Sequence, residues 1–290
     1  MSVKNVSFVG LGVMGYPMAG HLQKNGYNVT VFNRTESKAK KWVEEYGGQM
    51  GKTPNEASLH AEIVFMCVGR DEDIIEVMEG DNGILSSAKE GLTIVDHTTA
   101  SAEIARTYFA KLQKKNVAFL DAPISGGQAG AENGALSIMI GGQEKDFEVV
   151  KPVLQSYGKA IELIGPSGSG QIAKMINQIC IAGLVQGLSE AMAFGKKAKV
   201  DMEKVLSVIS KGAAQSWQME NRYRTMIDGK FDYGFAVDWM RKDLSICFNE
   251  AKKNGASLPI TEIVDKYYEE VQKNGGNRLD TSSLMTLVDK

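Results

Sequence analysis

Lys174, Asn177 and Gln178 combine side chains that could carry out proton transfer on a polar substrate. Their spacing places them on one face of a helix. A lysine in this position can exchange a proton with a reacting oxygen, and an amide beside it can orient the substrate. An ammonium in the opening turn is destabilised by the positive end of the helix macrodipole, which suggests a functional reason for Lys174. The alternative is an ordinary lysine whose stem covers apolar surface.

Gly10, Gly12 and Gly15 form a G-x-G-x-x-G pattern between an apolar run at 6–9 and a helical pattern that continues to about Lys24. In a dinucleotide-binding turn the first glycine makes the tight turn, the second admits the pyrophosphate and the third lets the helix pack. The helix N-terminus then faces the phosphates. We therefore expect the loop to bind a dinucleotide. The residues between the glycines, which share this loop, are Leu11, Val13 and Met14.

The residues after the second strand indicate which dinucleotide binds. An acidic residue there would accept hydrogen bonds from the ribose 2′-hydroxyl of NAD. This chain has Asn33, Arg34 and Thr35 instead. A guanidinium grips a 2′-phosphate that a carboxylate would repel, so NADP(H) is the preferred cofactor, with NAD(H) the alternative. An exposed arginine at a helix start is the competing interpretation.

A third polar segment, Ser125-Gly126-Gly127, follows a strand that ends near Asp121. Glycines beside a serine expose backbone N–H groups, which can hold a carboxylate. The segment could therefore hold a carboxylate, or it could be only a loop.

These segments belong to an alternation of apolar strands and amphipathic helices. The expected strands lie at about 6–9, 28–32, 63–68, 92–95, 117–120, 136–142 and 160–164. Such alternation predicts a parallel, doubly wound α/β sheet of the Rossmann type, with ligands at the carboxyl ends of its strands. We place this domain at residues 1–165.

Residues 166–290 are predicted to form an all-helical domain that begins with a long helix at about 171–197. Apolar residues lie almost all the way round this helix, so we expect it to be buried between layers. Lys174, Gln178 and Glu190 interrupt the apolar run, which argues against a membrane span. Further helices are expected at about 202–209, 218–226, 235–254 and 259–273.

Composition limits the function classes. The 290 residues have 43% hydrophobic content and a net charge of -2, so no electrostatic footprint favours nucleic acid or membrane. Cys67, Cys180 and Cys247 lack metal-type spacing and are interpreted as reduced core residues. No metal site is expected. Without a recognisable signal peptide, the expected location is cytoplasmic.

These motifs together resemble the β-hydroxyacid dehydrogenase family over essentially the whole chain. This family includes 3-hydroxyisobutyrate dehydrogenase, tartronate semialdehyde reductase and glyoxylate/succinic semialdehyde reductases. The segments that carry the resemblance are Gly10–Ala19, Asp121–Gly127, Gly168–Gln178 and Lys242-Asp243-Leu244.

The resemblance implies an NAD(P)-dependent oxidoreductase that interconverts a small hydroxy acid and its semialdehyde, with Lys174 as general acid and base. It further implies that Ser125, Gly126 and Gly127 bind the substrate carboxylate, and that Asn177 or Gln178 orients the substrate. Val68, Gly69 and Thr99 should line the nicotinamide half of the site, and Lys242 should approach the cofactor. The family also implies homodimers or homotetramers formed through the helical domain.

Two other classes of function remain. One is a dinucleotide-binding oligomerisation module without catalysis, which the presence of both Lys174 and the Ser-Gly-Gly loop argues against. The other is a relative of 6-phosphogluconate dehydrogenase. That enzyme would need a cluster of phosphate-binding basic residues in the substrate pocket, and none is obvious. The identity of the hydroxy acid is not determined by these patterns.

Overall fold

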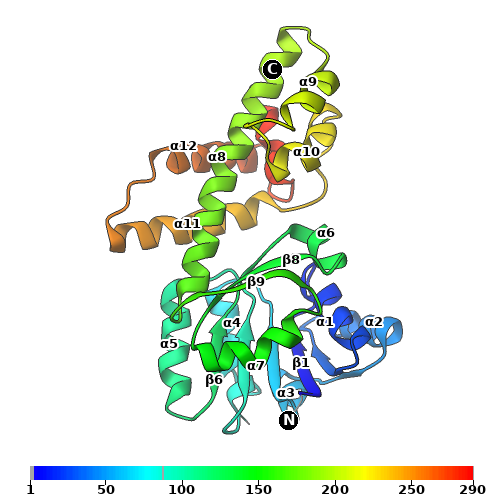
Figure 1. Cartoon of the computed structure of the whole chain (residues 1–290), viewed down its shortest axis with the longest axis vertical. Coiled ribbons are helices and arrows are strands. Elements are labelled where there is room, and N and C mark those ends of the chain that lie inside the picture. The colour runs from blue at the N-terminus through cyan, green and yellow to red at the C-terminus, as the bar shows by residue number, and fades with distance from the viewer. Residues whose placement is uncertain (1–2, 87, 290) are drawn as a thin grey trace. The chain divides into compact units, whose positions relative to one another are not determined.

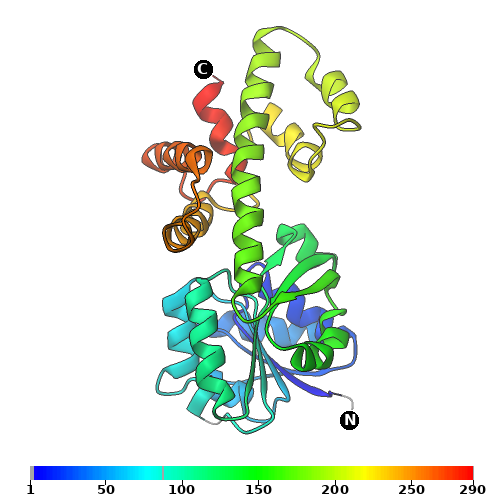
Figure 2. The same cartoon turned by 60° about the vertical axis from the view of Figure 1, so that its left-hand side comes forward.

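The computed structural model describes residues 3–86 and 88–289, which fall into two compact units, Met1–Lys174 and Met175–Lys290. Both units include part of the long helix α8 (Ser169–Lys197), which is continuous in Figures 1 and 2. The units therefore divide inside this helix, beyond the boundary at 165/166 that the sequence suggested.

The first unit contains a nine-stranded sheet in the order β3-β2-β1-β4-β5-β6-β8-β7, with β9 pairing with β8. Its strands are β1 (Asn5–Val9), β2 (Asn28–Phe32), β3 (Gln49–Met50), β4 (Ile63–Met66), β5 (Thr93–Asp96), β6 (Ala118–Asp121), β7 (Ile124–Ser125), β8 (Leu136–Gly141) and β9 (Gly158–Gly165). From β3 to β6 every pairing is parallel, as expected for a doubly wound fold. Beyond β6 the sheet departs from this pattern, because β8 runs antiparallel to β6 and β7.

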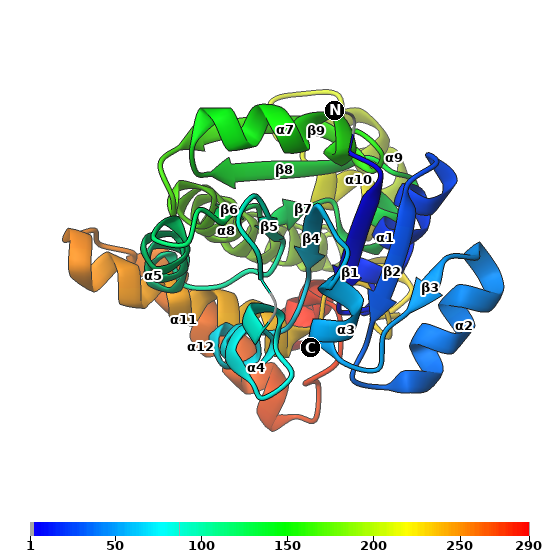
Figure 3. The same cartoon turned by 90° about the horizontal axis from the view of Figure 1, so that it is seen from below.

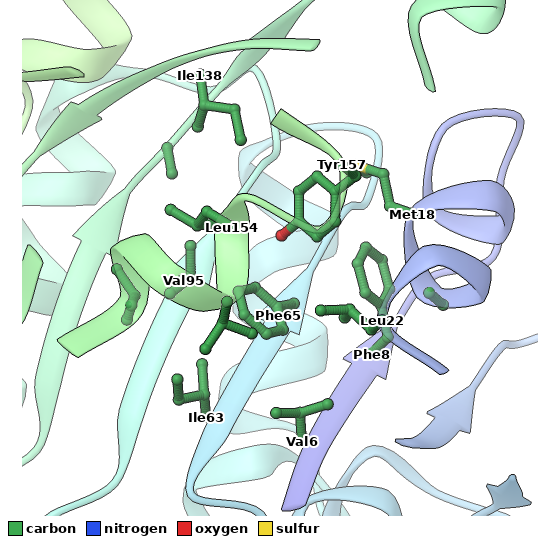
Figure 4. Packing of buried hydrophobic residues seen from close by; sticks show 14 of the residues in the cluster. Val6, Phe8, Met18, Leu22, Ile63, Phe65, Val95, Ile138, Leu154 and Tyr157 are labelled. Carbon is green, nitrogen blue, oxygen red and sulfur yellow. The ribbon is translucent and has the colours of Figure 1, made fainter. Parts of the chain in front are cut away.

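Helices cover both faces of this sheet (Figure 3). The helical segments are α1 (Gly15–Lys24), α2 (Glu36–Tyr46), α3 (Pro54–Ser58), α4 (Asp71–Glu79), η1 (Ile84–Ser86), α5 (Ala102–Gln113), α6 (Gly127–Glu132) and α7 (Glu144–Leu154). One core packs side chains of α1, α2, α6 and α7 against the sheet (Figure 4). The other packs those of α4, η1 and α5. The central strands are buried on both faces, which explains why their sequences are almost uninterrupted apolar runs.

The second unit is helical. After α8 it contains α9 (Met202–Ile209), α10 (Trp217–Ile227), α11 (Val237–Asn254), α12 (Pro259–Lys273), η2 (Thr281–Leu284) and α13 (Met285–Val288). Ala182 and Val185 of α8 pack with α11 and α12, and Leu188 and Met192 pack with α9 and α10. The predicted α/β sheet followed by a helical domain is therefore confirmed.

The predicted burial of the long helix all the way round was wrong. Ile176, Leu184 and Phe194 are 59%, 46% and 77% exposed in the single chain. Cys180 on the same helix is also exposed, so its assignment to the core was wrong, whereas Cys247 is buried and Cys67 half-buried. The apolar residues around Cys180 gave no sign of which side of α8 would pack against other helices.

By length and composition α8 is long and apolar enough to cross a membrane, with 44% of its most apolar window buried. A core helix of a soluble protein meets the same criteria. Since Ala182, Val185 and Met192 belong to the unit's hydrophobic clusters, the length of α8 alone does not indicate a membrane span.

Candidate active site

In the glycine turn after β1, Gly10 and Gly15 are closely packed, whereas Gly12 faces open space. A Cβ on Gly10, where φ is +98°, would lie 2.3 Å from the Cys67 carbonyl oxygen. A Cβ on Gly15 would lie 2.0 Å from the Gly10 carbonyl oxygen. At Gly12 no described atom lies within 4 Å of a Cβ. The protein's own packing thus explains Gly10 and Gly15, and the open position at Gly12 fits close approach of a pyrophosphate.

Asn33 holds the glycine turn in place. Its Oδ1 accepts a hydrogen bond of 2.9 Å from the backbone N–H of Leu11, and its Nδ2 donates one of 3.0 Å to the Thr35 carbonyl. The residues from Leu11 to Met14 lead into α1, where no described side chain caps the N-terminus and the first turn carries no acidic residue. Uncapped N–H groups and the positive end of the helix dipole suit a phosphate.

Arg34 projects from the end of β2 with its side chain 82% exposed. The structure adds two carboxylates from the neighbouring α4, because Arg34 Nη1 lies 3.8 Å from Asp73 Oδ1 and 4.0 Å from Glu76 Oε2. No local pattern signals this pairing across nearly forty positions. The net positive charge that a 2′-phosphate would meet at this point is therefore smaller than that of Arg34 alone.

Val68 and Thr98 join the ends of β4 and β5. The Val68 N–H donates a hydrogen bond of 3.0 Å to Thr98 Oγ1, and the Thr98 N–H donates one of 2.9 Å to Asp96 Oδ1. Gly69 and Thr99, predicted with Val68 to line the nicotinamide half of the site, are half-buried in the same segments. The carboxyl ends of β4 and β5 thus form a hydrogen-bonded platform.

Beneath this platform, burial raises the pKa of Asp96 from 3.8 to about 7. The hydrogen bonds from Thr98 oppose the shift, and the charge of Asp121 on the adjacent strand adds to it. In the β5–β6 register Asp96 lies directly opposite Asp121. Two acidic side chains therefore lie side by side at the buried strand ends.

The Ser125-Gly126-Gly127 segment has a backbone that glycine alone adopts readily. Ser125 ends β7, Gly126 has φ +133° and Gly127 has φ +60°. A Cβ on Gly127 would meet no described atom within 4 Å, so the backbone here is open. This geometry fits the predicted carboxylate site, in which accessible N–H groups hold an anion.

Asp121 holds the start of α8 and was missed as such from the sequence. Its Oδ1 accepts a hydrogen bond of 2.7 Å from the Gly168 N–H, and its Oδ2 accepts one of 3.0 Å from the Gln171 N–H. Burial raises the pKa of this carboxyl group, and those two hydrogen bonds counteract the rise. A carboxylate here complements the positive end of the α8 dipole, which disfavours the nearby Lys174 ammonium.

Gln171 was also missed, although it lies within the segment quoted for Lys174. Its side-chain Nε2 donates a hydrogen bond of 2.8 Å to the Thr98 carbonyl, and its Oε1 accepts one of 3.0 Å from the Ala100 N–H. Lys174, three residues further along α8, is 7% exposed. The first turn of α8 is therefore attached to the end of β5 as well as to β6.

The other predicted site residues lie in the second unit. Gln178 is 2% exposed, and its Nε2 donates a hydrogen bond of 2.7 Å to Asp243 Oδ2. The Asn177 amide donates one of 2.7 Å to Gln178 Oε1. Lys242 Nζ lies 3.0 Å from Asp243 Oδ1, and Asp243 is only 2% exposed. This ion pair is therefore not a surface pair, since its acidic partner is buried.

No group of three or more His, Cys, Asp or Glu side chains that could hold a metal ion occurs among residues 3–86 and 88–289. The chemistry that the described site residues offer is that of an amine, side-chain amides and open backbone N–H groups.

The chain matches two protein-family models. Residues 5–165 match the NAD-binding domain of 6-phosphogluconate dehydrogenase, and residues 168–288 match the NAD-binding domain of NADP-dependent 3-hydroxyisobutyrate dehydrogenase. An uncharacterised oxidoreductase from Shewanella frigidimarina is 58% identical over 285 residues, with 98% of each chain covered. The 2-hydroxy-3-oxopropionate reductase of Escherichia coli is 34% identical, with 98% of this chain and 97% of the relative covered.

Solved structures show the same fold. A Salmonella typhimurium 3-hydroxyisobutyrate dehydrogenase has a TM-score of 0.87 at 26% identity, covering 98% of this chain and 99% of that one. Fold, glycine turn and relatives together define an NAD(P)-dependent oxidoreductase that acts on CH–OH groups. The chain belongs to the β-hydroxyacid dehydrogenase family, which confirms the resemblance seen in its sequence motifs.

Proposed function

We propose that the protein is an NADP(H)-dependent dehydrogenase that interconverts a small hydroxy acid and its semialdehyde, as 3-hydroxyisobutyrate dehydrogenase does, with Lys174 as the general acid and base. The observation that carries this proposal is the attachment of the α8 start, one turn before a buried Lys174, to the ends of β5 and β6 through Gln171 and Asp121. Ligands of doubly wound sheets bind at these strand ends.

The cofactor would be held by Gly12 and its neighbours at the N-terminus of α1, by Arg34, and by the segments of Val68, Gly69 and Thr99. When bound, it supplies or accepts the hydride. In reduction Lys174 Nζ gives a proton to the oxygen of the forming alcohol, and in oxidation the neutral amine takes that proton back. NAD(H) is the alternative cofactor, and the carboxylates of Asp73 and Glu76 beside Arg34 favour some tolerance of it.

The substrate carboxylate would be bound by the open backbone at Ser125, Gly126 and Gly127. Asn177 is the better candidate to orient the substrate, because Gln178 is buried and hydrogen-bonded to Asp243. The relatives support a small hydroxy acid. One is named a 2-hydroxy-3-oxopropionate reductase, and another, from Eubacterium barkeri, a 2-(hydroxymethyl)glutarate dehydrogenase at 32% identity, covering 98% of this chain and 95% of that protein.

A substrate panel tests the proposal. The purified protein is assayed by NADPH and NADH absorbance with tartronate semialdehyde, succinic semialdehyde and glyoxylate, and in the reverse direction with 3-hydroxyisobutyrate and serine. We expect reduction of at least one of the aldehydes with NADPH, or oxidation of at least one of the alcohols with NADP⁺. Cofactor binding without turnover of any of them would instead support a non-catalytic dinucleotide-binding module. The panel also includes 6-phosphogluconate with NADP⁺, and turnover of this compound alone would support the other alternative.

We also propose that the protein forms a homodimer or homotetramer through its second unit. Phe194 on α8 and Val208 on α9 are 77% and 70% exposed, and a groove of about 520 Å³ between α8, α9 and α10 is lined mostly by apolar side chains. Apolar patches of this kind commonly mark interaction sites. A cytoplasmic location, with no nucleic-acid or membrane partner, remains the expectation from the composition.

A further inference from the structure

Gln171 is bound to the segment after β5 in the manner of a neighbouring strand. Its side-chain amide engages the carbonyl of Thr98 and the N–H of Ala100, two residues apart, at 2.8 and 3.0 Å. The side chain is 1% exposed, so water does not replace these bonds easily. A glutamine amide that uses both its donor and its acceptor on one backbone segment fixes the distance and the rotation of the helix that carries it.

This attachment continues to β4. Thr98, whose carbonyl Gln171 engages, accepts a hydrogen bond from the Val68 N–H through its hydroxyl group. Val68, Gly69 and Thr99 are the positions proposed to line the nicotinamide half of the site. Gln171 therefore connects the first turn of α8 to the backbone segments that would carry the hydride donor.

The backbone of the helix start is held against β6 and β8 by contacts that do not involve the Gln171 side chain. Asp121 holds the Gln171 N–H, and a Cβ on Gly170 would lie 2.4 Å from the Met139 carbonyl oxygen and 2.6 Å from that of Asp121. The backbone is thus packed against β6 and β8, while the Gln171 side chain sets its relation to β5. Lys174 follows by three residues, which places it on the same face of the helix as Gln171.

We propose that Gln171 is a positioning residue for Lys174, which sets the place of its amine relative to the segments at the ends of β4 and β5. This inference rests on the proposed function, because it assumes that Lys174 transfers the proton. Misplacing a reacting group by about 1 Å lowers turnover by ~10²-fold. Loss of the Gln171 amide should therefore reduce the rate of the chemical step and leave cofactor binding almost unchanged.

A double-mutant cycle separates positioning from a structural role. Gln171→Met keeps the approximate volume of the side chain and removes both hydrogen bonds, and it is combined with Lys174→Ala. Alone, Gln171→Met should lower kcat by about 10- to 100-fold, with the Kd for NADPH changed by less than about 3-fold. In the Lys174→Ala background it should change kcat by less than about 2-fold, because no amine remains to be positioned.

Gln186→Met is the matched control. Gln186 is a buried glutamine of the same helix whose side chain donates a hydrogen bond to Glu190 within α8. This variant should keep kcat within about 2-fold of the wild type. Melting temperatures of all variants are measured so that activity is compared well below unfolding. Should Gln171→Met fail to fold, Gln171→Glu enters the same cycle, since it keeps an acceptor for the Ala100 N–H and, when ionised, loses the donor to Thr98.

The two proposals fail in different ways. If the Gln171 variant lowers kcat by the same factor in the wild-type and Lys174→Ala backgrounds, Gln171 does not position Lys174. An equal loss of kcat in Gln186→Met would lead to the same conclusion. If Lys174→Ala keeps wild-type kcat, the proposed proton transfer falls instead, whatever Gln171 does.

Discussion

His97 and Tyr157 share a buried hydrogen bond, with 2.8 Å between His97 Nε2 and the Tyr157 hydroxyl oxygen. His97 Nδ1 lies 2.6 Å from the Ala122 carbonyl and must donate to it, so Nε2 accepts from the tyrosine. Tyr157 packs among the residues of the core shown in Figure 4, and its ring contacts Phe65 edge-on. Through these two bonds His97, the residue after β5, is attached to Tyr157 and to Ala122, which lies three residues before Ser125.

His97 should make the fold sensitive to acid. Burial lowers the pKa of His97 from 6.5 to about 4. As the pH falls through this range the unfolded chain takes up a proton that the folded protein does not, so stability is lost between about pH 6.5 and 4. His97→Gln lacks this titration. Relative to the wild type, its free energy of unfolding should rise by up to about 3 kcal/mol between pH 7 and 4, at about 1.4 kcal/mol per pKa unit. Urea unfolding at several pH values measures it, and a pH-independent difference would contradict the assignment.

Asp96 should act in the opposite direction. Its pKa is raised from 3.8 to about 7 by burial, so the folded protein keeps a proton that the unfolded chain releases, and stability is lost as the pH rises from about 4 to 7. Asp96→Asn keeps an acceptor for the Thr98 N–H and removes the titration. The free energy of unfolding of the variant, relative to that of the wild type, should increase by at most about 4 kcal/mol from pH 4 to pH 8. A difference that falls with rising pH would refute this prediction.

Lys174→Ala should reduce kcat by ~10²–10⁴-fold, which is the usual contribution of a positioned acid or base. NADPH affinity, measured by fluorescence titration, should stay nearly unchanged. Lys159→Ala, which changes an exposed lysine of β9, is the control and should keep full activity.

In the wild type, reduction should dominate near neutral pH and oxidation should be fastest in the alkaline range, where the amine can lose its proton. An oxidation optimum at or below neutral pH would count against Lys174 as the base.

Arg34→Asp should reverse the preference between NADPH and NADH, because a carboxylate repels the 2′-phosphate. Equal NADPH affinity in this variant would refute the assignment of Arg34. Asp73→Asn and Glu76→Gln should each strengthen NADPH binding by about 2- to 5-fold at low salt and less at high salt, since both carboxylates lie near Arg34 Nη1. NADH affinity serves as the internal control. Titrations with both cofactors measure the ratio of the NADPH and NADH dissociation constants.

The oligomer proposal is tested at the apolar surface of the second unit. Phe194→Glu and Val208→Glu should lower the molar mass in light scattering after size exclusion, because each places a charge on an exposed apolar surface beside or within the groove region. Val149→Glu is the control, since it changes a residue of α7 that is 50% exposed in the first unit. A wild-type protein that is monomeric at all concentrations would exclude the proposal.

Local patterns determined the elements and the cofactor turn. Gly10, Gly12 and Gly15 lie within six positions, between a strand and a helix, and the clash of a Cβ at Gly15 is with Gly10 in the same turn. The helices α9 and α12 have the predicted bounds, because their apolar periodicity is local. Lys174 was predicted to be functional because an ammonium is unusual at the start of an apolar helix.

Only the tertiary structure decided how these parts are attached. Asp121 meets Gly168 and Gln171 across 47 and 50 positions, and Gln171 meets Ala100 and Thr98 across 71 and 73. The pairing of Arg34 with Asp73, the antiparallel β8 and the exposure of Cys180 depend in the same way on which elements become neighbours. A residue's sequence neighbours determine its local conformation, whereas a hydrogen bond between distant segments depends on the packing of the whole sheet and its helices.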